Sequence, residues 1–188
     1  MSRIAAITVV ATSLLSAVAA ALVWSGQPYP RAATTLQPTW TEVAWPFPID
    51  QWGRGKAFRC KAADCGADVS LYLRAKFGFC NCVTGVSDDA ELDRMSDFDL
   101  VGEGTPLGAG RPIAIGRMQG RSRAYALPQT TGKIASNTAI SVAFNDRCDM
   151  VVATAVMPHD RPAAIEPGVI AFLNSGTVLR WAEMTLGL

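Results

Sequence analysis

The sequence has few of the residues that catalysis commonly uses. It contains one histidine, His159, and no Gly-x-Ser-x-Gly elbow, Ser-x-x-Lys pair or Walker-type loop. A hydrolase that pairs a serine or cysteine nucleophile with a histidine base would therefore depend on His159 alone. This residue stands in the segment Met157-Pro158-His159-Asp160, which is typical of an exposed loop. A hydrolase that depends on His159 stays open, but the sequence leans away from an enzyme.

An excess of either charge is also missing. The chain has 17 lysines and arginines against 16 aspartates and glutamates, which is a formal net charge of +1. This balance argues against a nucleic-acid partner and against a polybasic membrane patch. Among the basic residues, 13 arginines stand against four lysines. Together with abundant alanine and glycine, this bias favours a GC-rich bacterial genome, and we expect a Gram-negative source.

Charge is absent altogether from residues 4–24. The segment holds nine Ile, Val or Leu residues, seven Ala and four Ser or Thr, and it ends at Trp24. A helix of this length spans about 31 Å, close to the roughly 30 Å of a bilayer's hydrocarbon core. We predict a cytoplasmic start at 1–3 and a single-pass signal-anchor at 4–24 in the bacterial inner membrane, with the C-terminal domain in the periplasm. A signal peptide cleaved near the alanines at 17–21, followed by secretion, is the alternative.

Residues 25–45 show little hydrophobic periodicity and contain three prolines, which indicates a linker. The remaining residues, 46–188, have the length of one extracytoplasmic domain. Four aromatic residues stand around the start of this domain. We interpret them as a strap folded onto it, and the alternative is a platform for an aromatic ligand; they are Trp40, Trp45, Phe47 and Trp52.

Hydrophobic patterning in 46–188 predicts an α+β fold with a largely antiparallel sheet. The alternation in VSLYLRA predicts a strand at 69–75, and FGFCNCV predicts a second strand at 77–83 that forms a hairpin with the first. Runs of β-branched and aromatic residues separated by turn residues predict four more strands. These lie at Pro112–Met118, Ser122–Leu127, Ala139–Phe144 and Asp149–Val156.

Two short helices are predicted beside this sheet. Ser87 is suited to an N-cap of a helix that runs to Met95 and buries Leu92 and Met95. A second helix is predicted from Glu166 to Asn174, because proline is tolerated in a first helical turn. After it, residues 177–184 form a last strand or a short helix.

Acidic and basic residues are separated along the chain. Residues 88–103 hold seven acids and one arginine, whereas residues 104–145 hold no acid at all. The simpler interpretation is that the two stretches lie side by side and neutralise each other. The alternative is a basic strip for an anionic ligand or partner. Its members would be Arg111, Arg117, Arg121 and Arg123.

Four of the five cysteines are close together in the sequence, at Cys60, Cys65, Cys80 and Cys82. In an oxidising compartment this cluster predicts two disulfides. Two cysteines separated by one residue on a strand have Cα atoms about 7 Å apart, near the upper limit for a disulfide. We therefore expect Cys80 and Cys82 to bond across to Cys60 and Cys65. Cys148 would then be a free, buried thiol; alternatively it pairs with Cys80 or Cys82.

Metal sites compete with the disulfides. The one-residue gap between Cys80 and Cys82 is poor spacing for zinc. Copper(I) favours soft thiolate and thioether ligands, so these two cysteines could bind it, although no methionine motif accompanies them. Asp97-x-Asp99-x-x-Gly102 begins like a calcium-binding loop but has Gly108 where the bidentate acid should stand. We expect no resident cofactor or metal.

The sequence therefore favours a membrane-anchored periplasmic domain without evident catalysis, which binds an envelope protein as an accessory factor. The alternative is a thiol-redox or copper-handling periplasmic protein that uses the cluster of Cys60, Cys65, Cys80 and Cys82.

Overall fold

The computed structural model describes residues 38–78, 83–128, 137–158 and 162–188. They belong to a compact unit that begins at Leu36. The described residues form eight strands: β1 (Trp40–Val43), β2 (Lys56–Cys60), β3 (Val69–Lys76), β4 (Thr105–Pro106), β5 (Arg111–Ile115), β6 (Met118–Ala126), β7 (Asn137–Asp146) and β8 (Asp149–Pro158). They also form five helices: α2 (Ala62–Cys65), α3 (Asp89–Met95), α4 (Phe98–Val101), α5 (Pro162–Leu173) and α6 (Gly176–Leu186).

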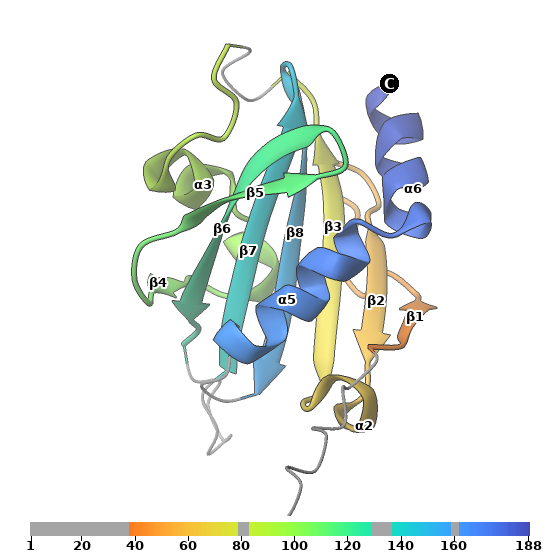
Figure 1. Ribbon diagram of the computed structural model, residues 1–188, viewed down its shortest axis with the longest axis vertical. Helices are drawn as coiled ribbons and strands as arrows, with labels where there is room; N and C mark the ends of the chain where they lie inside the picture. The colour runs from red at the N-terminus through yellow and green to blue at the C-terminus, as the bar shows by residue number, and fades with distance from the viewer. Residues whose placement is uncertain (1–37, 79–82, 129–136, 159–161) are drawn as a thin grey trace, which may run out of the picture. The chain divides into compact units, whose positions relative to one another are not determined.

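All eight strands join one antiparallel sheet in the order β1-β2-β3-β8-β7-β6-β4, and β5 pairs with part of β6 (Figure 1). Three long strands, β3, β8 and β7, form the centre of the sheet, so both of their edges are paired. Strands β1 and β4 end the order. The antiparallel sheet predicted from the sequence is confirmed.

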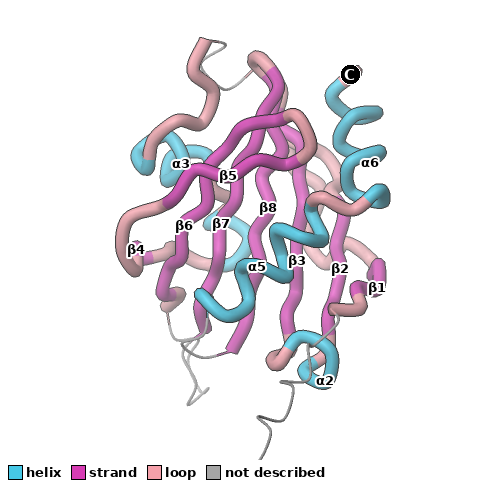
Figure 2. Tube along the Cα trace, in the orientation of Figure 1, coloured by secondary structure: helices cyan, strands magenta, loops and turns pink. Residues whose placement is uncertain are grey.

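Helices α5 and α6 pack on one face of the sheet, in front of it in Figures 1 and 2. Side chains alternate along each strand, so every second residue of β3, β7 and β8 points toward these helices. The helices contribute a buried row that repeats every three or four residues, as an apolar helix face requires. This row consists of Ile165, Val169, Leu173, Val178, Ala182 and Leu186.

Helix α3 packs on the other face, where the core is smaller and the strands carry polar residues. Leu92 and Met95 of α3 are fully buried against β7 and β8. Beside this apolar patch, the buried residues of β3 include Arg74 and Lys76. The two faces therefore differ in chemistry: α5 and α6 cover an apolar layer, whereas α3 and α4 cover charged side chains.

Several predicted elements are confirmed. The strand predicted at 69–75 is β3, and the four strands predicted in the second half are β5 to β8, with ends that differ by at most four residues. The helix predicted from Ser87 to Met95 is α3, but its N-cap is Asp88, whose side chain accepts a hydrogen bond from the Glu91 amide at 2.8 Å. Residues 177–184 lie in a helix, α6, and not in a strand.

The predicted hairpin of 69–75 with 77–83 is wrong. Strand β3 pairs with β2 and β8, so no edge is left for a strand that follows it directly. Gly78 has a φ of 63°, which ends the extended backbone of β3, and its amide donates to the Asp149 carboxylate at 2.7 Å. Residues 79–82 lie outside the described part.

Two boundaries also differ from expectation. Residues 40–43, assigned to the linker at 25–45, form β1, because they pair along their whole length with β2. The helix predicted to open at Glu166 begins at Pro162 instead, and Pro167 lies inside it. A proline at the first helical position loses no helical hydrogen bond, so Pro162 is suited to that place.

The prediction that aromatic residues near the start of the domain fold onto it is confirmed for Trp40, Trp45 and Phe47. The Trp45 and Phe47 rings pack edge-to-face on Tyr72, at centroid distances of 6.1 and 4.8 Å. Trp40 stacks on Phe172 at 4.9 Å on the other face of the sheet.

Among the residues that the structure describes, no helix has the length and apolarity to cross a bilayer. The anchor predicted at 4–24 lies outside these residues and stays a prediction.

Candidate functional site

The acidic and basic stretches lie against each other, as the simpler interpretation predicted. Arg121 pairs with Asp89, and Arg123 pairs with Asp93 at 2.9 Å, so α3 is joined to β6 by ion pairs. Arg111 points to the other face, where its Nε donates to Glu166 of α5 at 3.0 Å. Arg117 lies exposed in the β5–β6 turn. Three of the four arginines thus contact carboxylates of their own chain, and anion binding by them stays a prediction.

Tyr125 completes the contact between β6 and α3. It is 1% exposed, and its hydroxyl donates to the Asp93 carboxylate at 2.5 Å. Burial raises the pKa of Tyr125, and the adjacent Asp93 carboxylate raises it further. The phenol therefore keeps its proton and acts as a donor, which excludes a role as a base at neutral pH.

Asp89 accepts hydrogen bonds from two groups and lies near a third, cationic one. Its carboxylate binds the Arg121 guanidinium and the Gly110 amide at 3.0 Å, and Arg123 lies 3.8 Å away. The hydrogen bond from Arg121 is the main reason that the pKa of Asp89 falls below its ordinary value of 3.8, and the Gly110 amide adds to the effect. The carboxylate is therefore more acidic in the folded chain than in the unfolded chain.

This pKa shift predicts a pH dependence of stability. A carboxyl whose pKa is lower in the folded state stabilises the fold above its unfolded pKa, and it loses this contribution as the pH falls through the folded pKa. We expect Asp89→Asn to lower the free energy of unfolding at pH 7, and we expect the difference from the wild type to shrink progressively below about pH 4. Urea unfolding from pH 2.5 to 7 measures it. Exposed Glu103 provides the control, Glu103→Gln, and a difference for Asp89→Asn that is constant with pH would contradict the prediction.

A second charged cluster lies on the same face, beneath α4. Arg74 of β3 has a side chain that is only 2% exposed, and its Nη2 contacts the equally buried Asp97 at 2.5 Å. Its guanidinium also contacts Asp50 and Asp99. Lys76, two residues along the strand, contacts Asp97 at 2.8 Å and donates to the Met95 carbonyl oxygen at 2.7 Å.

In this cluster the pKa values of Arg74 and Asp50 shift in the directions that favour their charged forms. Burial alone would lower the pKa of Arg74, but the hydrogen bonds and charges of Asp97 and Asp99 raise it above its ordinary value. Burial would raise the pKa of Asp50, yet the Trp52 amide and Arg74 together lower it. The cluster joins two cations, Arg74 and Lys76, to three carboxylates, so its role is to hold α4 and the strap segment on the sheet.

The cysteines pair differently from expectation. Cys60 and Cys65 bond to each other, with Sγ atoms 2.01 Å and Cα atoms 6.0 Å apart. The expected bonds from these two residues to Cys80 and Cys82 are therefore wrong. Helix α2, one turn long, folds Cys65 back toward the end of β2 and brings the Cα atoms within disulfide range. Cys148 is also disulfide-bonded and so is not a free thiol.

The remaining predicted site residues lie outside the described part of the chain. These are Cys80 and Cys82, with their alternative copper site, and His159. Within residues 38–78, 83–128, 137–158 and 162–188, no group of three or more His, Cys, Asp or Glu side chains could hold a metal.

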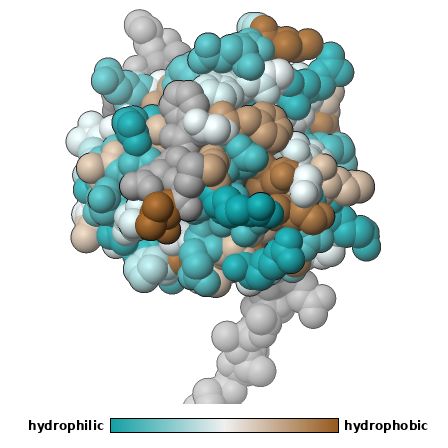
Figure 3. All heavy atoms as spheres, turned by 90° about the horizontal axis from the view of Figure 1, so that it is seen from above, coloured by the Kyte–Doolittle hydropathy of each residue, from teal (hydrophilic) through white to brown (hydrophobic). Residues whose placement is uncertain are grey.

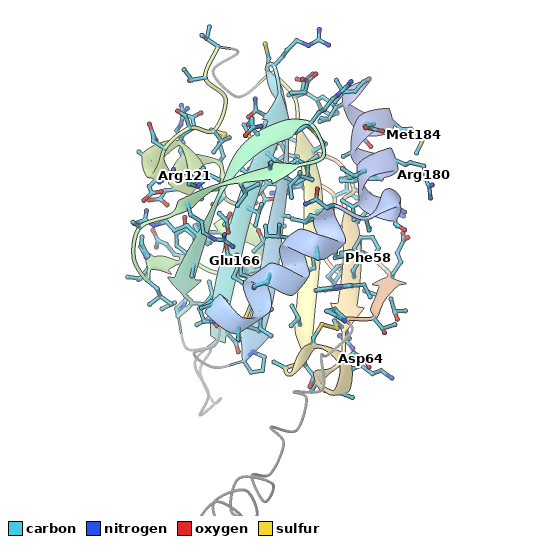
Figure 4. The ribbon with its side chains drawn as sticks, viewed as in Figure 1. Phe58, Asp64, Arg121, Glu166, Arg180 and Met184 are labelled. Atoms are coloured by element: carbon cyan, nitrogen blue, oxygen red, sulfur yellow. A yellow bond between two sulfur atoms is a disulfide. The ribbon has the colours of Figure 1, made fainter. Side chains whose placement is uncertain are left out.

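A groove lies between α6 and the paired strands β1 and β2 and extends to the end of this strand pair. It has two adjoining lobes of about 220 and 330 Å³, which share Glu42, Lys56 and Trp181. Figure 4 shows Arg180 and Met184 on α6 and Phe58 on β2 beneath. Seen from above, apolar and polar side chains alternate in small patches over the surface (Figure 3).

The first lobe has an apolar floor. Phe58 and Leu73 come from neighbouring strands and are 4% and 0% exposed, which makes the floor part of the core. Trp181 is partly exposed, and Met184 above it is 75% exposed. The lobe therefore combines a rigid base with an aromatic ring and a flexible thioether that solvent can reach.

The second lobe is more polar and lies at the end of the β1–β2 pair. It is lined by residues 43–45 and by Arg54, Gly55 and Lys56. A Cβ at Gly55 would overlap the Trp45 ring and the Leu73 carbonyl oxygen, so only glycine allows this close approach. Lys56 forms an ion pair with Glu42 across the two strands.

Sequence reasoning missed this groove. Its members come from β1, β2, β3 and α6, and none of them forms a recognisable motif. The alternation that predicted β3 also makes Arg74 and Lys76 neighbours on one face of a buried strand. Two basic residues in such a strand indicate buried ion pairs, so this cluster could have been predicted from the sequence.

Comparisons with models of protein families, with curated proteins and with solved structures found no match for this chain.

Proposed function

We propose that this chain is a membrane-anchored periplasmic accessory domain that binds another envelope protein through the groove between α6 and the β1–β2 pair. The anchor and the compartment rest on the uncharged segment at 4–24 and on the abundance of arginine and alanine. The observation that carries the proposal is the groove itself, because it joins an ordered apolar floor to exposed side chains.

The residue types of the groove support protein binding. Tryptophan, methionine and arginine are enriched in protein interfaces, and tryptophan and arginine are among the residues that contribute most to their binding energy. Trp181, Met184 and Arg180 supply one of each on consecutive turns of α6. The lobes lie at or below the lower end of the usual range for small-molecule sites, about 300–1,000 Å³. They therefore suit one or two side chains of a partner better than a cofactor.

Cross-linking in living cells tests the proposal. A photoreactive phenylalanine analogue at Met184 of the full-length chain should give a discrete covalent adduct with one protein, since this position is exposed at the groove. Arg94 on α3 is also exposed but lies on the opposite face of the sheet, so it is the matched control position.

Adding Trp181→Ala to the Met184 cross-linking variant should reduce the adduct at least about fivefold, because aromatic residues are the usual anchors of interfaces. Equal adducts from positions 184 and 94, or no adduct at position 184, would show that the groove is not the binding surface.

A further inference from the structure

The groove lies next to a strand that has a free edge. Strand β1 pairs with β2 only, among the strands that the structure describes, and Thr41, Glu42 and Val43 are exposed. The free backbone groups of such an edge can pair with an extended segment of another protein. Side chains of the added strand would alternate between the two faces of the sheet, and one set would point toward α6.

The charge of the groove rim is unbalanced. Lys56 is neutralised by Glu42. Arg54 lines the polar lobe, and Arg180 lines the apolar lobe. Both side chains are exposed, and neither forms an ion pair within the described residues. The rim therefore carries two uncompensated positive charges, one at each lobe. This arrangement is complementary to a ligand with carboxylates on both sides of an apolar group.

Size and shape favour a peptide over a lipid. A lobe of about 220 Å³ accommodates a single apolar side chain, whereas an acyl chain requires a longer channel. A lipid would also make no use of the backbone groups along β1. An extended acidic peptide uses the edge, the apolar lobe and both arginines together.

We infer that the groove binds an extended acidic segment of the partner by adding it as a strand to β1. An apolar side chain of this segment enters the apolar lobe from the side of Glu42, and Asp or Glu residues two positions before and after it, which point to the same face, pair with Arg54 and Arg180. The inference rests on the proposed function and specifies the class of partner.

Peptide selection tests the chemistry. The full-length chain in nanodiscs is used to select from a displayed library of random ten-residue peptides. Selected peptides should share a central apolar residue with Asp or Glu two positions away on each side, because these side chains point to the same face as the apolar one. A synthetic copy of the strongest binder, labelled with fluorescein, then reports affinity by anisotropy.

Matched charge reversals test the contacts. The double variant Arg54→Glu with Arg180→Glu should lower the affinity for the selected peptide at least about tenfold, because two attractive charge pairs become repulsive. Arg59→Glu is the control: it changes the same charge on β2 but on the opposite face, and it should alter the affinity less than about twofold. Unchanged circular dichroism spectra confirm folding of each variant.

Backbone pairing has its own test. In an antiparallel pair, alternate residues direct their N–H groups to the neighbouring strand. N-methylation of successive peptide residues should therefore weaken binding at every second position, whereas a peptide held only by its side chains would show no alternation.

The outcomes separate this inference from the proposed function. The inference that the segment is acidic would be overturned by selected peptides that lack acidic residues. It would also be overturned if the double arginine variant bound the peptide with unchanged affinity. An adduct at Met184 would still support protein binding at the groove. Competition by soluble dihexanoylphosphatidylglycerol at similar concentration would indicate a lipid site instead. If only a second copy of this chain binds, as sedimentation would reveal, the inference is also overturned.

Discussion

Asp97→Asn should lower the free energy of unfolding by about 3 kcal/mol, because it leaves two buried cations without their common counter-charge. Removing one partner of a buried ion pair costs about 3–5 kcal/mol. Asp97 is 2% exposed and contacts both Arg74 and Lys76. We expect the lower end of this range because Asp50 and Asp99 still contact the Arg74 guanidinium.

Urea unfolding at pH 7 measures this change, and Asp99→Asn is the matched control. Asp99 contacts the same guanidinium at 3.2 Å but its side chain is 61% exposed, so its loss should cost less than about 1 kcal/mol. Similar losses for the two variants would mean that burial of Asp97 contributes nothing, which would contradict the structural role assigned to this cluster.

Gly120→Ala should lower the free energy of unfolding by at least about 2 kcal/mol, because an added methyl group has no space in the sheet. Gly120 lies on β6 between β5 and β7, opposite Ile113 and Phe144. A Cβ there would overlap the Ala143 carbonyl oxygen and would lie 2.7 Å from the Cα of Phe144. Both atoms belong to the backbone, so the clash can be relieved only by moving β7.

Gly176→Ala is the control for this prediction. Gly176 is the first residue of α6, and a Cβ there would lie no closer than 3.7 Å to any heavy atom outside its immediate chain neighbours. Alanine is favoured over glycine in a helix by up to about 1 kcal/mol, so this variant should be neutral or slightly more stable. Thermal unfolding of both variants checks the pair, and a stable Gly120→Ala variant would show that β6 and β7 are less closely packed than described.

Local patterns in the sequence predicted most of the individual elements. Alternation identified β3, and β-branched runs between turn residues identified β5 to β8, because each pattern reflects one buried face of a strand. The pairing of β3 with β8 joins residues far apart in the sequence, so local patterns cannot identify it. The hairpin expected after β3 does not form because the preceding strand β2 and the distant strand β8 already occupy both edges of β3.

The candidate sites also differ in how far local sequence could predict them. The neutralisation of acidic by basic residues could be predicted, because the charge of each stretch is a property of composition. The groove could not be predicted, since Lys56 and Trp181 meet only after β2 and α6 pack against one sheet. The Cys60–Cys65 bond depends on the tight turn of α2, which no periodicity in a four-residue helix can signal.

The position of β1 has a mechanical consequence. Any tension transmitted along the chain from the predicted anchor reaches this strand before any other described element, and β1 is held by four residues of pairing with β2 and by the stacking of Trp40 on Phe172. A force applied at the Trp40 end would break the β1–β2 residue pairs one after another. Strand β1 would therefore detach at a low force. Glu42 of β1 lines both lobes of the groove. Tension on the tether would therefore dismantle the groove before it disturbed the central strands.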